Sequence, residues 1–203
     1  MDTDFLITAF VTMFVVIDPI ALMPIFLSLT QGMDGAHRRG IALRMGAVSF
    51  GILAMFAFFG EPVLDFIGIS MPAFRIAGGV LLFLTALDML FERRTKRRED
   101  RIEDMPDPSV FPLAIPLVAG PGAITTVILL AGQNPGVQGT MLVLGVAFAV
   151  LVVLVVSFFG ASLIERAIGR TGINVVTRLL GMLLAALAVQ FILVGLRDFG
   201  FAG

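Results

Sequence analysis

Long apolar runs constrain the fold of this sequence more than any other feature. One run extends over residues 5–29 and contains a single charged side chain, Asp18. A helix that crosses the hydrocarbon core of a bilayer needs about 20 mainly apolar residues. Similar runs recur in a chain that is 58% hydrophobic and 14% charged, with a mean hydropathy of +1.03. The sequence therefore predicts an integral membrane protein with one membrane domain, 1–203.

Six runs are long enough to cross a membrane. They are continuous rather than alternating, which favours helices over the strands of a barrel. We therefore predict an all-α integral membrane protein with six transmembrane helices. The predicted spans are 5–29, 41–60, 72–91, 110–132, 141–164 and 175–197.

Composition excludes several classes of function. The chain has no cysteine and its one histidine is His37, so thiolate catalysis and Cys-based or His-rich metal sites are excluded. It also lacks a GxxxxGK[ST] nucleotide motif. A net charge of −1 gives no reason to expect nucleic acid as a partner. We expect neither an enzyme nor a protein that depends on a cofactor.

Basic residues predict the orientation of the helices, because Lys and Arg concentrate in cytoplasmic loops. All Lys and Arg residues except Arg75 and Arg197 lie in or next to the first, third and fifth loops. Both termini are therefore predicted on the extracytoplasmic side. The third loop, 92–109, is predicted to be a solvated cytoplasmic linker, since its acidic and basic residues balance. The alternative is that its basic cluster at 93–98 binds anionic lipid.

The two halves of the chain resemble each other on either side of this linker. The sequence VVIDPIALMPIFLSLTQ (15–31) aligns with LVAGPGAITTVILLAGQ (117–133). In this alignment Pro19 corresponds to Pro121, and the order of the matched segments is kept along the chain. The similarity predicts an internal repeat.

The topology of the repeat follows from the number of helices in each half. Residues 1–91 and 110–203 each contain three predicted spans, an odd number, so the second half must enter the membrane from the opposite side. RIAG at Arg75 and RLLG at Arg178 then fall on opposite faces. We therefore predict two inverted three-helix repeats, a plan that is frequent in secondary transporters.

Helix breakers interrupt the first and fourth predicted spans. Asp is a favoured N-cap and Pro is tolerated in the first helical turn, so Asp18-Pro19 predicts a new half-helix. Gly120-Pro121-Gly122 predicts the same in the fourth span. Broken helices persist at membrane depth only where protein covers them or where they line a wet cavity. Two equivalent breaks predict one central substrate-binding site, whereas an isolated break could be a simple kink.

The two breaks differ in charge. Asp18 can cap its own half-helix, whereas Gly120 leaves the N–H groups near Gly122 open to an anionic or carbonyl group. This difference suits a zwitterion, or a cation coupled to an anion. Asp88, near the end of the third span, is instead expected at the membrane interface.

Other polar residues have two alternative roles each. Thr125 and Thr126 follow the second break and either line the same site or bond to their own helix. Gln190 either faces the site or forms a hydrogen bond across helices. Arg75 and Arg178 are either interfacial anchors or part of a gate.

At DPIALMPIF (18–26) and PLAIPLVAGPGAI (112–124) the sequence resembles the MarC family of bacterial inner-membrane proteins. The resemblance covers the whole chain. One departure is that Ala21 and Leu22 stand where the family more often has Gly and Asn, so no Asn ligand is carried over. The family is grouped with LysE-like exporters of amino acids and other small solutes. The resemblance therefore implies a transporter-like protein of the inner membrane without a defined substrate.

Two functions remain open from the sequence. The first is a secondary transporter or exporter of a small polar solute, with its site at the two breaks. The second is a non-transporting membrane protein, such as a scaffold, a stress-related factor or a lipid-binding protein. The expected partners are the solute and membrane lipids, and the sequence leaves open whether the chain also forms a homo-oligomer.

Overall fold

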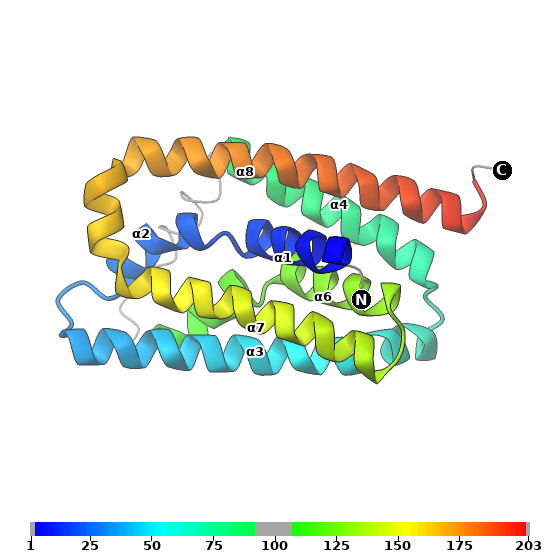
Figure 1. Ribbon diagram of the computed structural model, residues 1–203, viewed down its shortest axis with the longest axis horizontal. Helices are drawn as coiled ribbons and strands as arrows, with labels where there is room; N and C mark the ends of the chain where they lie inside the picture. The colour runs from blue at the N-terminus through cyan, green and yellow to red at the C-terminus, as the bar shows by residue number, and fades with distance from the viewer. Residues whose placement is uncertain (1–2, 92–106, 202–203) are drawn as a thin grey trace.

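The computed structural model describes residues 3–91 and 107–201, and every element within them is helical (Figure 1). Five helical segments are long and apolar enough to cross a membrane, and the bent pair η1–α6 would add a sixth. This confirms the predicted all-helical membrane protein. The elements are α1 (Thr3–Ile17), α2 (Pro19–Leu29), α3 (Gly35–Phe66), α4 (Met71–Leu90), η1 (Ser109–Val118), α6 (Pro121–Gln133), α7 (Val137–Phe159) and α8 (Ala161–Phe199).

Several helix ends differ from the predicted spans. Helix α3 extends beyond the predicted 41–60 at both ends, and it begins early because Asp34 caps it by accepting a hydrogen bond from His37 N at 2.7 Å. The fifth span ends at Phe159 rather than at residue 164. The following residues form the first turns of α8, which changes direction at Gly169, where φ is 68°.

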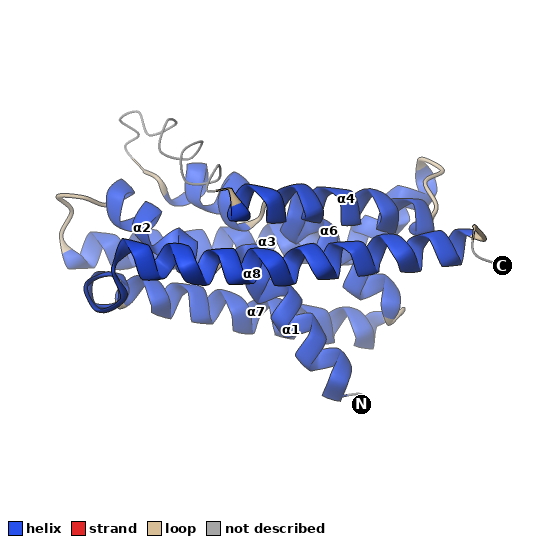
Figure 2. Cartoon of the chain, turned by 90° about the horizontal axis from the view of Figure 1, so that it is seen from above, coloured by secondary structure: helices blue, strands red, loops and turns tan. Residues whose placement is uncertain are grey.

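Most of the helices lie roughly parallel or antiparallel along one long axis, whereas α1 is inclined to it and the first turns of α8 run across it (Figures 1 and 2). α4 packs along α8, and α3 packs along α7 and the η1–α6 segment. Glycines bring the backbones of α4 and α8 close together, which is a common basis of helix association in membranes. The distances from an added Cβ to the opposing carbonyl oxygen would be 2.8 Å for Gly79 to Ala188, 3.3 Å for Gly181 to Ala86 and 3.0 Å for Gly195 to Pro72.

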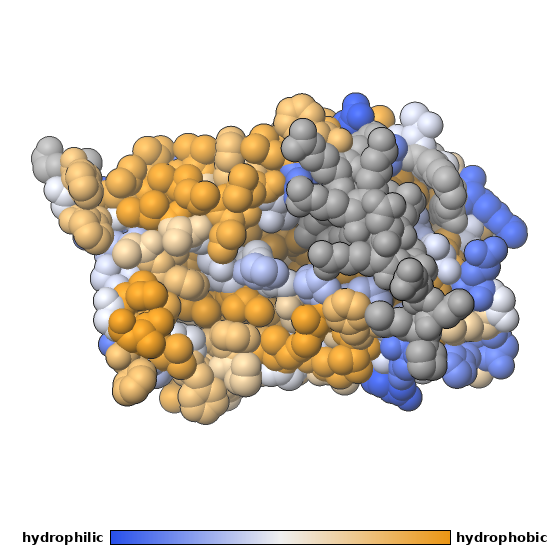
Figure 3. Space-filling view, turned by 180° about the vertical axis from the view of Figure 1, so that it is seen from behind, coloured by the Kyte–Doolittle hydropathy of each residue, from blue (hydrophilic) through white to orange (hydrophobic). Residues whose placement is uncertain are grey.

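Apolar side chains fill the centre of the bundle and cover much of its sides. Met13 and Ile17 of α1 are fully buried. The rings of Phe26 on α2 and Phe158 on α7 stack with centroids 4.2 Å apart. On the outer face, hydrophobic side chains form broad areas, whereas hydrophilic ones gather near one end (Figure 3). This distribution is expected for a bundle surrounded by lipid.

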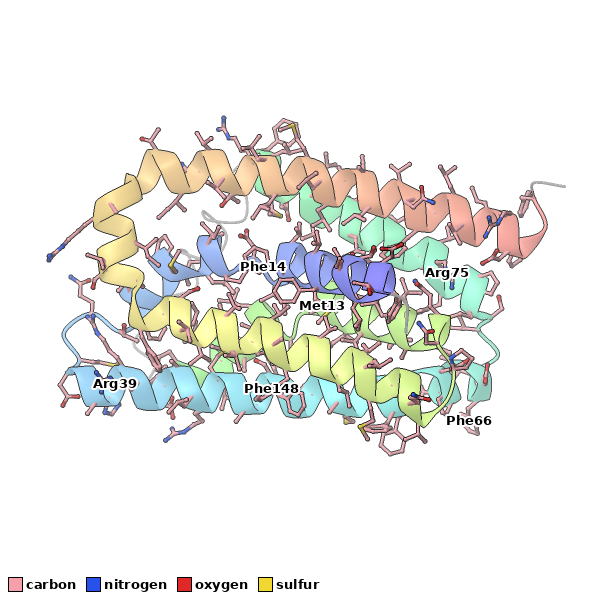
Figure 4. All side chains as sticks on the ribbon, viewed as in Figure 1. Met13, Phe14, Arg39, Phe66, Arg75 and Phe148 are labelled. Carbon is pink, nitrogen blue, oxygen red and sulfur yellow. The ribbon has the colours of Figure 1, made fainter. Side chains whose placement is uncertain are left out.

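The connections between successive spans lie at the two ends of the bundle (Figure 1). Arg39, at the start of α3, lies at one end, and Arg75 lies near the other (Figure 4). The predicted lipid-binding cluster at 93–98 and most of the predicted linker fall outside the described residues.

One ion pair lies where the chain enters η1. Asp107 pairs with Arg44 of α3, and its Oδ1 accepts a hydrogen bond from Ser109 N at 3.0 Å. The nearby hydroxyl and the backbone N–H of Ser109, together with the charge of Arg44, hold the pKa of Asp107 below its ordinary value of 3.8. This end of η1 is thereby tied to α3.

Candidate functional site

The first interruption of a helix lies at Asp18, between α1 and α2. Asp18 has a left-handed backbone, with φ 56° and ψ 67°, which is uncommon for a residue other than glycine. Its Oδ1 accepts a hydrogen bond from Ala21 N at 3.2 Å, and Pro19 occupies the first turn of α2. Asp18 is completely buried. A polar cap therefore starts a new helix inside the bundle, within a single candidate span that extends over Thr3–Leu29.

The second interruption lies at Gly120, between η1 and α6, whose directions differ by 56°. Pro121 occupies the first turn of α6, and Gly120 provides no side-chain cap. A Cβ at position 120 would lie 2.3 Å from the carbonyl oxygen of Pro116, so only glycine fits there without displacing the backbone. The N-terminal end of α6 therefore has no side-chain cap, and its first N–H groups stay available to a ligand.

A cavity of about 200 Å³ lies beside this second interruption. Pro116, Gly120 and Gly122 line one side of it, and Val16 of α1 contributes an apolar wall. α4 contributes residues spaced as one face of a helix. These are Leu81, Leu84, Thr85 and Asp88.

The α4 face supplies the polar side chains of the cavity. The Thr85 hydroxyl donates to Leu81 O at 3.0 Å, and Asp88 is half-buried. A carboxylate and a hydroxyl thus face the start of α6, whose N-terminus carries a partial positive charge. This arrangement can accommodate a small polar molecule in an otherwise apolar surrounding. Within the described residues, no three His, Cys, Asp or Glu side chains are arranged to hold a metal ion.

The predicted residues Gly120, Pro121 and Gly122 all line the cavity, whereas Asp18 and Pro19 are buried outside its lining. The roles in binding that the sequence predicts for these five residues stay predictions.

The predicted threonines of α6 lie against helices rather than in the cavity lining. Both are buried. Thr126 donates from its hydroxyl to Gly122 O, one turn earlier, at 2.8 Å. Thr125 packs its methyl group against α4, where a Cβ added to Gly78 would lie only 2.2 Å away. Both side chains therefore join α6 to its surroundings.

The remaining predicted residues lie far apart. Gln190 and Arg178 are exposed on α8. Arg75 forms an ion pair with Asp198, with Nη1 and Oδ2 2.5 Å apart, and only 11% of its side chain is exposed. This contact joins the start of α4 to the end of α8.

Sequence reasoning missed Thr85 and Asp88 as residues near a site. Asp88 was expected at the membrane interface because it lies close to the end of its span. The available signal was their spacing, since residues three apart on a helix share a face. That signal becomes informative only when the helix opposite them is known.

The sequence of the chain is similar to known membrane proteins over almost its whole length. Residues 3–199 match the family described as "MarC family integral membrane protein". The chain belongs to the MarC family. A UPF0056 membrane protein of Archaeoglobus fulgidus is 38% identical over 198 residues, covering 96% of this chain and 93% of the relative. The UPF0056 membrane protein YvbG of Bacillus subtilis is 36% identical over 202 residues, covering 95% of this chain and 94% of the relative.

Matches to the MarC family therefore span nearly the full length of the chain. The names of these two relatives describe membrane proteins and state no substrate. No solved structure matches the chain significantly.

Proposed function

We propose that this MarC family protein transports a small polar solute across the membrane, and that the solute binds in the cavity beside Gly120. The observation that carries this proposal is the cavity itself, of about 200 Å³, where the start of α6 faces Thr85 and Asp88. Pockets of this kind combine apolar walls with a few polar groups that orient a ligand. Interrupted helices at membrane depth are typical of the sites of secondary transporters.

An inverted repeat of residues 1–91 and 110–203 is part of the proposal. The pairing of helices supports it, because α4 packs on α8 and α3 packs on α7, each joining equivalent helices. The contact of α2 with α8 corresponds to that of α6 with α4, and the contact of α2 with α7 corresponds to that of α6 with α3. In both halves a proline follows the N-cap of the second half-helix. A two-fold axis in the membrane plane would relate these contacts.

We further propose a bacterial inner-membrane location with both termini on the extracytoplasmic side. The arginines near the start of α3, Arg38, Arg39 and Arg44, support this orientation, because basic residues favour the cytoplasmic side. The grouping with LysE-like exporters, which the resemblance implies, agrees with a non-enzymatic role in export.

A screen of solute-induced thermal stabilisation tests the proposal. The purified protein is heated in detergent with a library of small zwitterionic, anionic and cationic metabolites, and hits are tested for uptake in proteoliposomes. A solute at 100 times its dissociation constant should stabilise the folded state by about 2.7 kcal/mol. We expect Gly122→Leu to abolish this stabilisation, because the new side chain would start beside Val16 and Leu82 and fill the cavity.

Gly145→Leu is the matched control. A Cβ at Gly145 of α7 would meet nothing within 4 Å, so this variant adds the same side chain away from the cavity. It should keep both solute stabilisation and uptake. Transport at this cavity is refuted if no solute stabilises the protein, or if both leucine variants behave alike.

A further inference from the structure

The outward face of α8 carries a regular seam. In the view from above, α8 lies nearest the viewer with no helix in front of it (Figure 2). Along this face, exposed residues alternate at spacings of four and three, the repeat by which one helix packs on another through knobs into holes. The seam consists of Leu179, Leu183, Ala186, Gln190 and Leu193, all of which are exposed.

Gln190 makes this seam different from an ordinary lipid-facing surface. It lies inside the candidate span Thr171–Asp198, and no hydrogen bond of its amide occurs within the part of the chain that the structure describes. Several hydroxyl groups at the helix surface are satisfied by their own helix. Thr85, Thr140 and Ser157 each donate to the carbonyl four residues earlier. An amide exposed to hydrocarbon has no such partner and is costly.

We propose that a second copy of this chain covers the seam, so that two α8 helices form a homodimer with Gln190 paired across the interface. Copies inserted in one orientation place their α8 helices parallel, and a two-fold axis along the membrane normal brings like residues together at the same depth. The Gln190 amide both donates and accepts, so it can pair with itself. Ala186, one turn away, allows the two helices to approach closely.

The polar end of α8 is compatible with this arrangement. Arg197 continues the seam beyond Leu193, and its Nε lies 3.4 Å from Oδ1 of Asp198 in the same chain. This carboxylate, which also pairs with Arg75, offsets part of the positive charge that two parallel copies would bring together at the membrane surface. The dimer does not depend on the proposed transport, because the seam lies on the outside of the bundle.

Cysteine cross-linking in native membranes tests the dimer, because the chain contains no cysteine. Single variants Ala186→Cys and Leu193→Cys are oxidised and analysed for a covalent dimer. A disulfide requires Cα atoms within about 7 Å, so like positions of the seam should cross-link efficiently. Val152→Cys, on the exposed face of α7 and 44% exposed, is the control and should stay monomeric.

A second measurement tests the role of the amide. Gln190→Leu should weaken dimerisation roughly three- to tenfold in sedimentation in density-matched detergent, the effect of losing hydrogen bonds across membrane helices, whereas Gln190→Asn should retain most of it. The dimer is refuted if the unaltered chain sediments as a monomer, with or without bound lipid. Equal cross-linking at position 152, or unchanged dimerisation of Gln190→Leu, would also refute it.

Discussion

Substitution of Asp18 tests how α2 begins inside the bundle. Asp18→Ala removes the hydrogen bond that Oδ1 accepts from Ala21 N at 3.2 Å, in a place where no solvent replaces it because Asp18 is completely buried. Loss of such a cap costs about 1–2 kcal/mol. A left-handed backbone at φ 56° adds about 1 kcal/mol for a residue with a Cβ and no polar side chain. We therefore expect Asp18→Ala to lower the free energy of unfolding by about 2–3 kcal/mol.

Two further variants separate the cap from the backbone conformation. Asp18→Gly also loses the cap but avoids the left-handed penalty, so its loss should be about 1 kcal/mol smaller than that of Asp18→Ala. Asp18→Asn keeps both the cap and the tolerance of a left-handed backbone, so it should lie within about 0.5 kcal/mol of the unaltered protein.

Equilibrium unfolding in mixed micelles with increasing SDS measures these differences. Asp4→Ala, which removes an exposed carboxylate in the first turn of α1, is the control and should cost no more than about 0.5 kcal/mol. An Asn variant as unstable as the Ala variant, or an Ala variant as stable as the unaltered chain, would contradict this account. If Asp18→Asn folds but no longer responds to a solute, the charge rather than the cap serves binding.

Two other contacts give predictions of stability. Gly78→Ala should lower the free energy of unfolding by about 1–3 kcal/mol in the same SDS titration, because its methyl group would lie 2.2 Å from the methyl of buried Thr125. Combining it with Thr125→Ser, which removes that methyl, should recover stability. If stability is not recovered, the clash with Thr125 is not the cause of the loss. The lowered pKa of Asp107, caused first by Ser109 and then by Arg44, means that these contacts contribute fully above pH about 4 and are lost as the pH falls through the lowered value. Because the pair is exposed, Asp107→Asn should remove at most about 1 kcal/mol of acid-dependent stability between pH 5 and pH 2, and an unchanged acid profile would argue against the contact.

The sequence predicted the class of fold because apolar length is a local property. Runs of about 20 apolar residues identify membrane helices without any knowledge of their partners. Helix ends depend on caps, and the Asp34 cap of α3 lay outside the apolar run from which its span was predicted. The charged stretch around Gly169 predicted a loop at 165–174, whereas the structure continues the helix through it and only changes direction at Gly169.

The sequence could indicate only the part of the candidate site that is formed by helix-breaking residues. Gly120 and Pro121 interrupt a helix by their own geometry, so sequence alone could indicate the place. Thr85 and Asp88 belong to the cavity only because α4 faces that interruption, which is a tertiary fact. Conversely, Thr126 is a polar residue in the right sequence region, but its hydroxyl bonds to its own helix.

Close contact between α4 and α8 has a consequence for motion. At Gly79 and Gly195 the opposing carbonyl oxygens leave no room for even a methyl group, so sliding one helix along the other would bring larger side chains into collision. We therefore expect α4 and α8 to move together. If the cavity opens to release a solute, we expect the bend of 56° between η1 and α6 to change while the packing of α4 on α8 is kept.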